Sequence, residues 1–328
     1  MKLYSKILLS AIGALALSGC HSAIMSDLTK CPQYTVFTFD VRTPDEISFP
    51  DNKIDDVRVF AFDESGKLIG EWKDGGVAFL PGYEIRTDFY RPGATTSFVA
   101  WAGKDLGLYD FSAFKAGADK KDLLVFMAKE ADKIKADAAP LYVAEPTGGD
   151  LVQKERSTLG TQTDEVHFSF VQITNHFHFD IQGFSTEHTY TMTFTAKNSR
   201  YKANGDLAED TPFEWTTDTF KQTADGVNGT ARLTADYDIL RLVKGEKGDY
   251  LVTIKDETGR VVYEFDPLAD FILYPGLGMD GSGNPFKDHL DLNHDFNISI
   301  VVDTFDGTYM ALKATIQNWN IVFRREKL

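Results

Sequence analysis

The chain is short of cysteine and of positive charge, and both shortages limit what the protein can be. Its 328 residues include only two cysteines, Cys20 and Cys31, and 34 Lys and Arg face 49 Asp and Glu, a formal charge of −15. Such an acidic excess argues against nucleic acid as a partner and against electrostatic attachment to anionic lipid. Beyond the N-terminal stretch, no apolar run approaches the roughly 20 residues of a membrane helix. These shortages favour a solvated globular protein.

Familiar catalytic motifs are missing as well. The chain contains no G-x-S-x-G, no P-loop and no H-E-x-x-H, which are patterns of hydrolases, nucleotide-binding proteins and zinc proteases. Its scattered Asp and Glu residues do not sort into an acid and a base on sequence grounds. We therefore predict no catalytic residue, no cofactor and no enzymatic activity.

The N-terminal twenty residues carry the most specific signal. Lys2 and Lys6 precede an apolar run over residues 7–17, which closes on Leu17-Ser18-Gly19-Cys20. A basic start, about ten apolar residues and a small-residue exit are typical of a secretory signal. The closing Leu-Ser-Gly-Cys is similar to a bacterial lipobox, in which the Cys thiol becomes bonded to diacylglycerol. We predict a signal peptide at 1–19 and lipidation of Cys20, with an ordinary signal peptide and a chance Cys as the alternative.

A tether is predicted between the lipid and the first domain. Residues 20–33 show no strand or helix pattern and lead to Cys31-Pro32. A multiply acylated Cys20 would hold the protein on a membrane firmly, since single acyl chains anchor only marginally. With Cys20 acylated, Cys31 has no partner for an intramolecular disulfide. Cys31 is then either a small buried hydrophobe or a reactive thiol.

Alternating apolar residues predict strands along most of the chain. The first is Tyr34 to Val41, followed by a hairpin of residues 55–63 and 67–72 and by a strand at 96–102. Residues 166–183 form a longer strand whose apolar phase changes near Thr174-Asn175, which predicts a bulge. Further strands are expected at 189–196, 229–237, 250–255, 261–265, 271–274, 296–303, 309–317 and 319–324.

One segment departs from this pattern, and one composition shift suggests a boundary. Within residues 107–139, Leu123, Leu124, Phe126 and Met127 recur at helical spacing, so we expect one helical excursion there. Residues 145–164 lose periodicity and gather Gly, Pro and Thr. We therefore predict a mainly β protein with two β-sandwich domains, 34–150 and 151–328, that fold independently and meet between residues 145 and 165.

Two clusters could bind metal. His176 and His178 lie two residues apart and so share one face of a strand, which would suit two metal ligands. The run from Asp291 to Asn297 alternates oxygen ligands as a calcium loop does, but Phe296 replaces the glycine of its sixth position. A solvated strand face and a polar turn explain these two patterns more simply. We predict no metal at either place.

Several motifs along the chain together resemble one family. They are Cys20, Cys31-Pro32, YTVFTFDV at 34–41, DDVRVFAFDESGKLIGEW at 55–72, SFVAWAG at 97–103, LYVAEPTGG at 141–149, the aromatic strand at 166–184 and IQNW at 316–319. In this order they are similar to FimB-like fimbrial anchor subunits, the lipid-anchored type V pilus proteins of Bacteroidales. The resemblance implies two tandem transthyretin-like β-sandwich domains held at the outer membrane by lipid. Its implied partners are fimbrial shaft or accessory pilin subunits.

The resemblance also implies how the subunits join. Pilins of this type exchange strands, so that an extended segment of one subunit fills a groove in the next. An anchor should keep its own N-terminal strand, here 34–41, and end the fibre. We expect a partner to add at the terminal strand, residues 314–323; alternatively Trp319, Ile321 and Phe323 merely complete a core.

Two other functions compete with this one. A surface lipoprotein that binds glycan would need exposed aromatic platforms, whereas Trp72, Trp101 and Trp319 lie inside strand patterns typical of a core. A lipid-anchored hydrolase is the least supported, because the motifs named above are absent.

Overall fold

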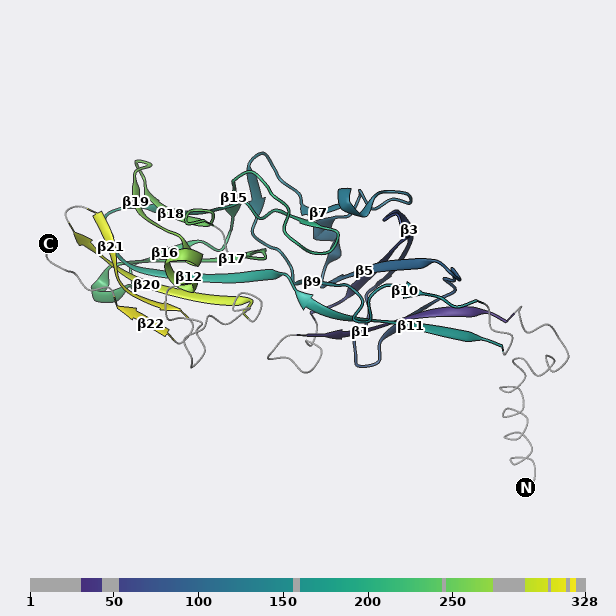
Figure 1. The fold of residues 1–328 in the computed structure, drawn as a ribbon. Helices are drawn as coiled ribbons and strands as arrows, with labels where there is room; N and C mark the ends of the chain where they lie inside the picture. The colour runs from purple at the N-terminus through teal and green to yellow at the C-terminus, as the bar shows by residue number, and fades with distance from the viewer. Residues whose placement is uncertain are drawn as a thin grey trace, which may run out of the picture.

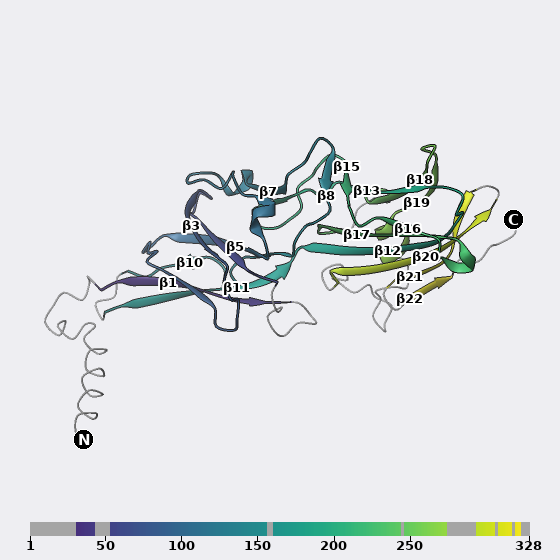
Figure 2. The ribbon, with the colours of Figure 1, turned by 180° about the vertical axis from the view of Figure 1, so that it is seen from behind.

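The computed structural model describes residues 31–42, 53–155, 160–243, 246–273, 293–305, 308–316 and 319–322. The predicted signal peptide and Cys20 lie outside them. As predicted, the protein is mainly β, and its strands form an elongated body with β1 near one end and β21 and β22 at the other (Figures 1 and 2). Within the described residues, no helix is long and apolar enough to cross a membrane.

The first part of the body is one curled sheet. Its strands follow the order β3-β2-β5-β9-β11-β1-β4, and β10 pairs with β5. Their bounds are β1 Gln33–Val41, β2 Asp56–Phe62, β3 Leu68–Gly75, β4 Glu84–Thr87, β5 Thr95–Gly103, β9 Leu141–Ala144, β10 Leu151–Val152 and β11 Gln162–Gln172. The predicted strand at 34–41, hairpin at 55–72 and strand at 96–102 are thereby confirmed. The sheet encloses a core to which Phe37, Phe98 and Phe168 contribute.

The predicted helix within 107–139 is wrong. The segment contains two single helical turns, η3 (Leu106–Leu108) and η4 (Lys120–Asp122), and three short strands, β6 (Tyr109–Asp110), β7 (Leu124–Met127) and β8 (Lys133–Lys135). Leu123, Val125 and Met127 are buried, whereas Leu124 and Phe126 are half-buried, so the true period is two. Pairing of β7 with the distant strand β14 (Arg200–Lys202) overrides the local helical spacing.

The long predicted strand at 166–183 consists of two strands in different sheets. Strand β11 belongs to the first sheet, and β12 (Thr174–Phe184) starts the second after Ile173. Because Ile173 belongs to neither strand, the buried positions change from even to odd residue numbers there. This accounts for the phase change, and the predicted bulge is not present at this point. A true register shift lies later, between Gln182 and Phe184. There Gly183 has a φ of +109°, and a Cβ would lie 2.0 Å from the carbonyl oxygen of Val302.

The second part is a sandwich of two sheets. One has the order β16-β17-β12-β20-β21-β22 and the other β19-β18-β13-β15-β8, with a small sheet β14-β7-β6 beside the junction. The bounds are β13 Tyr190–Ala196, β15 Phe213–Thr216, β16 Lys221–Thr223, β17 Ala231–Leu240, β18 Leu251–Asp256, β19 Val261–Phe265, β20 Asp295–Phe305, β21 Thr308–Ile316 and β22 Trp319–Val322.

Short helical turns interrupt this second part. Turn η5 covers Val227–Gly229, and the six-residue turn η6 covers Pro267–Ile272. The predicted strand at 271–274 is therefore wrong in its first three residues, and residue 274 lies outside the described ones. Asp266 caps the turn by accepting from the backbone N–H groups of Leu268 and Ala269, which favours a helical turn over an extended chain.

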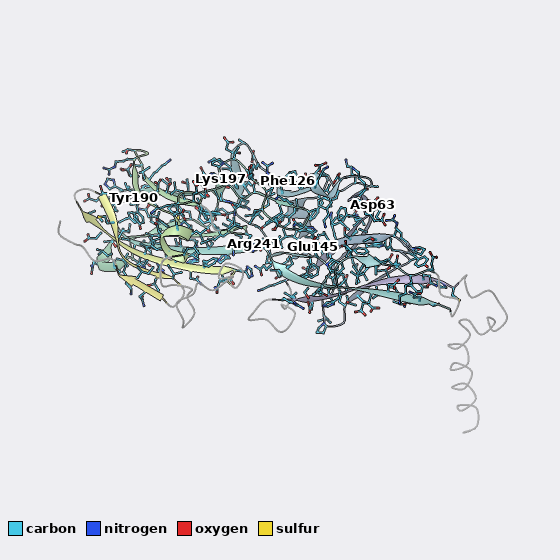
Figure 3. All side chains as sticks on the ribbon, viewed as in Figure 1. Asp63, Phe126, Glu145, Tyr190, Lys197 and Arg241 are labelled. Atoms are coloured by element: carbon cyan, nitrogen blue, oxygen red, sulfur yellow. The ribbon has the colours of Figure 1, made fainter. Side chains whose placement is uncertain are left out.

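The two parts share a continuous interior. Trp101 of the first sheet donates from Nε1 to the carbonyl of Ala203 at 3.1 Å, and its ring lies 6.0 Å from that of Tyr201. Side chains fill the body along its length, including the region around Arg241 (Figure 3). Strands β10 and β11 both belong to the first sheet, and β12 starts the six-stranded sheet after Ile173. The domain boundary between residues 145 and 165 and the independent folding of the two parts stay predictions.

Candidate assembly interface

The N-terminal strand β1 is held in the interior of its sheet. It pairs in parallel with β11 on one side and antiparallel with β4 on the other. Phe37 and Phe39 are at most 4% exposed. The ring of Phe37 lies 5.2 Å from that of Trp72, and Phe39 stacks on Phe170 at 5.6 Å. Strand β1 thus fills its own groove.

A buried amide fastens the start of β1. Gln153, which is 2% exposed, donates from Nε2 to Thr35 Oγ1 at 3.1 Å and to Asp164 Oδ2 at 3.1 Å. Its Oε1 accepts the backbone N–H of Arg91, and Thr35 Oγ1 donates to the carbonyl of Phe89 at 2.8 Å. Because buried polar groups are costly unless they are bonded, this network fixes where β1 sits along its neighbours.

The C-terminal strand β22 has the opposite setting. It lies at the margin of the six-stranded sheet and pairs with β21 from Ile316↔Trp319 to Lys313↔Val322. Ile321 is 8% exposed and belongs to the core, whereas Asn320 is exposed. Among the described strands, none pairs with the outer side of β22. Ile321 therefore contributes to the core, as one part of the alternative interpretation held, and no described strand covers the outer backbone edge of β22.

The backbone donors of that edge can be assigned. Two residues separate Ile316 from Trp319, so these partners form the hydrogen-bonded pair of a tight hairpin. Since bonding direction alternates along a strand, the N–H groups of Asn320 and Val322 face away from β21. An unpaired edge of this kind is a template for strand addition.

His176 and His178 bind carboxylates of the neighbouring strand β17. His176 Nδ1 lies 2.8 Å from Asp238 Oδ1, and His178 Nδ1 lies 2.6 Å from Asp236 Oδ1. The hydrogen bond with Asp238 raises the pKa of His176 above its ordinary 6.5, against the opposing effect of burial. Within the described part of the chain, no group of three or more His, Cys, Asp or Glu residues could hold a metal ion. The carboxylate partners were not predicted, because they depend on the register of β17.

The predicted calcium-like run lies only partly within the described residues. Asp291 and residue 292 lie outside them, and β20 begins at Asp295. Phe296 is 1% exposed, while Asp295 and Asn297 are exposed on the other face. The alternation of the strand places Asp295 and Asn297 on one exposed face, opposite the buried ring of Phe296.

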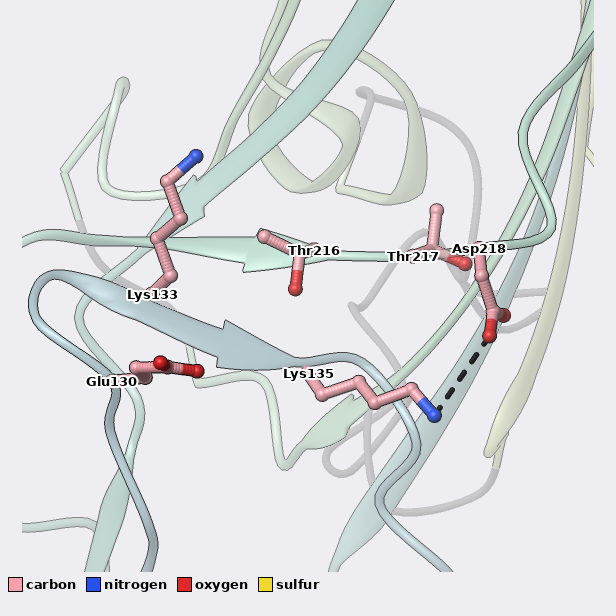
Figure 4. Close-up of a pocket in the computed structure, with 6 residues that line it drawn as sticks. All are labelled: Glu130, Lys133, Lys135, Thr216, Thr217 and Asp218. Atoms are coloured by element: carbon pink, nitrogen blue, oxygen red, sulfur yellow. Dashed lines mark ion pairs between the residues drawn. The ribbon is translucent and has the colours of Figure 1, made fainter.

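A shallow pocket not anticipated from sequence lies beside β8 and β15. It encloses about 480 Å³ and is lined by Glu130, Lys133, Lys135 and residues 216–218 (Figure 4). Lys133 Nζ lies 3.0 Å from Glu214 Oε1, and Lys135 Nζ lies 3.8 Å from Asp218 Oδ2. Strand β8 is the margin of its sheet, and lysines on such a strand discourage pairing with other chains. The lysines around the pocket therefore protect this edge.

The aromatic residues considered as sugar platforms serve the interior. Trp101 is fully buried, and Trp72 packs between Phe37 and Phe89, whose ring lies 5.1 Å away. The predicted core role of these two tryptophans is confirmed, while the side chain of Trp319 lies outside the described ones. Cys31 is half-buried and directly precedes Pro32 and β1.

Comparison with known proteins identifies the class. A model of the family described as fimbrillin-A associated anchor proteins Mfa1 and Mfa2 matches residues 28–324. The chain belongs to this family, whose members are structural proteins of fimbriae and not enzymes. The expected kinship with fimbrial anchor proteins is thus confirmed, and with it an association with the cell-surface fimbrium. No curated protein sequence matches the chain.

Solved structures share the fold. The fimbrial anchor protein Mfa2 from Porphyromonas gingivalis superposes with a TM-score of 0.70 at 18% identity, covering 89% of this chain and 99% of that one. A candidate polysaccharide-binding protein from Bacteroides thetaiotaomicron gives 0.66 at 18%, covering 90% and 99%. A candidate adhesin from Bacteroides ovatus gives 0.65 at 17%, covering 93% and 99%.

Proposed function

We propose that this protein is a lipid-anchored subunit that holds or terminates a type V pilus at the outer membrane. The observation that carries the proposal is the contrast between its end strands. Strand β1 occupies its own groove with Phe37 and Phe39 buried, so no incoming strand is needed there. Strand β22 leaves an outer edge unpaired among the described strands. One closed end and one open end suit the end of a fibre.

The joint is proposed to form by strand addition at β22. An extended segment of a shaft or accessory pilin would accept the outward N–H groups of Asn320 and Val322 and extend the six-stranded sheet. No described strand occupies the outer side of β22, where such a segment would add. The proposal also places the whole subunit on the cell surface, as part of the fimbrium.

A pair of proline variants tests the joint. Asn320→Pro and Val322→Pro each remove one outward N–H group, whereas Asn320→Ala keeps the donor and removes the side chain. In proline variants that keep a cooperative melting transition, fibres should appear in the medium, and Asn320→Ala should retain them on the cell. Fibres that stay attached to cells carrying both folded proline variants would show that this edge does not form the joint.

The lipid attachment has its own test. The proposal places the acyl chains on Cys20, since it alone follows an apolar run and a small-residue exit. Cys20→Ala should leave the protein uncleaved or soluble on fractionation. A variant that loses its signal peptide and still partitions fully into detergent would refute lipidation at Cys20. Selective binding to a carbohydrate array would favour the glycan-binding alternative.

A further inference from the structure

We propose that β1 is the strand through which the subunit resists tension, gripped lengthwise by β11 so that a pull on the N-terminus shears the two strands. The inference rests on the proposed function, because a lipid tether at one end and a fibre at the other would place the body under tension. It goes further by naming the element that resists this tension.

The directions of the strands set the shear geometry. Strands β1 and β11 run parallel, in register from Gln33↔Gln162 to Val41↔Phe170. Both begin at the end of the body where the described chain starts, at Cys31, and β11 continues through Ile173 into β12, which extends toward the opposite end (Figures 1 and 2). A tether that pulls on β1 before Gln33 therefore acts along the strand and against the β11–β12 ribbon.

Shear loads the hydrogen bonds between the strands together. The backbone N–H of Arg42 donates to the carbonyl of Phe170 at 2.8 Å. Since bonding direction alternates, the N–H groups of Thr38 and Asp40 also face β11, evenly spaced as in any parallel pair. Bonds in this arrangement must stretch at the same time before β1 can move. Strands that are pulled apart from one end lose the same bonds one after another, which takes much less force.

Side chains add a second barrier to sliding. Moving β1 by one residue would turn Thr38 and Asp40 into the core in place of Phe37 and Phe39. Restoring the alternation takes a shift of two residues, about 6.6 Å, during which both rings must leave their sites. The strand is thus held in one register.

Polar contacts on the outer face hold the same register. Thr38 Oγ1 lies 3.0 Å from His167 Nδ1 and donates to Glu165 Oε1 at 3.0 Å. His167 Nε2 lies 3.4 Å from Asp40 Oδ2. With the Gln153 network at the start of the strand, β1 has contacts on both faces and at its loaded end.

Single-molecule pulling of the full chain in two geometries tests the proposal. A Cys20→Ala background leaves Cys31 as the native thiol for one handle. In the shear geometry the second handle is on Thr186→Cys, in an exposed turn after β12. In the unzipping geometry it is on Thr161→Cys, exposed and next to Gln162, the register partner of Gln33. The same strand β1 is loaded in both.

We expect rupture in the shear geometry at several-fold higher force than in the unzipping geometry, and a lower shear force in a folded Phe39→Ala variant. Equal forces in the two geometries, or a shear force unchanged by Phe39→Ala, would overturn the proposal. Melting transitions of all variants establish that they are folded. Purified protein is pulled without fibres or membrane, so this result does not depend on the proline-variant test of the proposed function.

Discussion

The two ends of the chain are built as strands of opposite kinds. Strand β1 has nine residues, neighbours on both sides and two phenylalanine rings in the core. Strand β22 has four residues and one described neighbour. The difference follows from their surroundings: β1 lies between β11 and β4, whereas β22 extends a hairpin outward. Residues 35–38 of β1 are paired on both sides and leave no edge there for an added strand, whereas β22 has an outer side that no described strand covers.

Truncating one core side chain in each strand should give the largest effect. Phe37→Ala removes a fully buried ring and should lower the free energy of unfolding by about 4 kcal/mol. Ile321→Ala, at the sheet margin, should cost about 2 kcal/mol. Chemical denaturation of both variants measures the difference. A larger loss of unfolding free energy for Ile321→Ala than for Phe37→Ala would mean that β22, and not β1, is the more firmly packed strand.

Two glycines with positive φ, one crowded and one not, distinguish the cost of a steric clash from the cost of the backbone conformation. Gly183→Ala puts a Cβ against the Val302 carbonyl at positive φ and should cost about 3 kcal/mol. Gly259 also has positive φ, but a Cβ at this position would meet no atom within 4 Å, so Gly259→Ala should cost about 1 kcal/mol. Urea denaturation measures both losses of unfolding free energy. Similar values for the two variants would mean that β12 and β20 are not closely packed at Gly183.

The junction of the two parts can be tested with one hydroxyl. Tyr201 is buried, donates to the carbonyl of Ile173 and accepts the backbone N–H of Arg241 at 2.7 Å. The N–H of Arg241 also donates directly to the carbonyl of Ile173 at 2.9 Å, so both groups keep a partner in Tyr201→Phe, and the loss should be about 1 kcal/mol. In Tyr237→Phe a single long bond to Met192, 3.4 Å, is lost, and the effect should be smaller. Two separated unfolding transitions in Tyr201→Phe would indicate that this hydroxyl couples the parts.

The smallest expected effect is a pH dependence in the second part. The pKa of His176 is raised in the folded state by Asp238, with help from Asp295 and Asp236. A raised pKa stabilises the fold fully below the ordinary value of 6.5, and the contribution is lost as pH rises through the folded pKa. Melting temperature should therefore fall slightly above neutral pH in the wild type and less in His176→Asn. If the melting temperatures of the wild type and of His176→Asn change with pH in the same way, His176 does not cause the pH dependence.

Sequence reasoning succeeded where local alternation decides the structure. At 34–41 the apolar residues alternate, as in a strand with one buried face, so both the strand and the burial of Phe37 and Phe39 were predictable. At 107–139 it failed, because Leu123 to Met127 fits either period until β14 pairs with β7. Partners distant in sequence also decide which sheet each half of 166–184 joins and which carboxylates meet His176. The open edge of β22 was predictable in position, but its lone described neighbour was known only from the fold.

Amide hydrogen exchange on the subunit alone and bound to isolated fibres tests the closed and open ends most directly. We predict that the amides of residues 35–38 in β1 exchange slowly in both states, because this part of the strand is paired on both sides. The amides of Asn320 and Val322 should exchange readily in the subunit alone and become protected in the complex. Protection that appears on β1 upon binding, with β22 unchanged, would contradict the assignment of the closed and open ends.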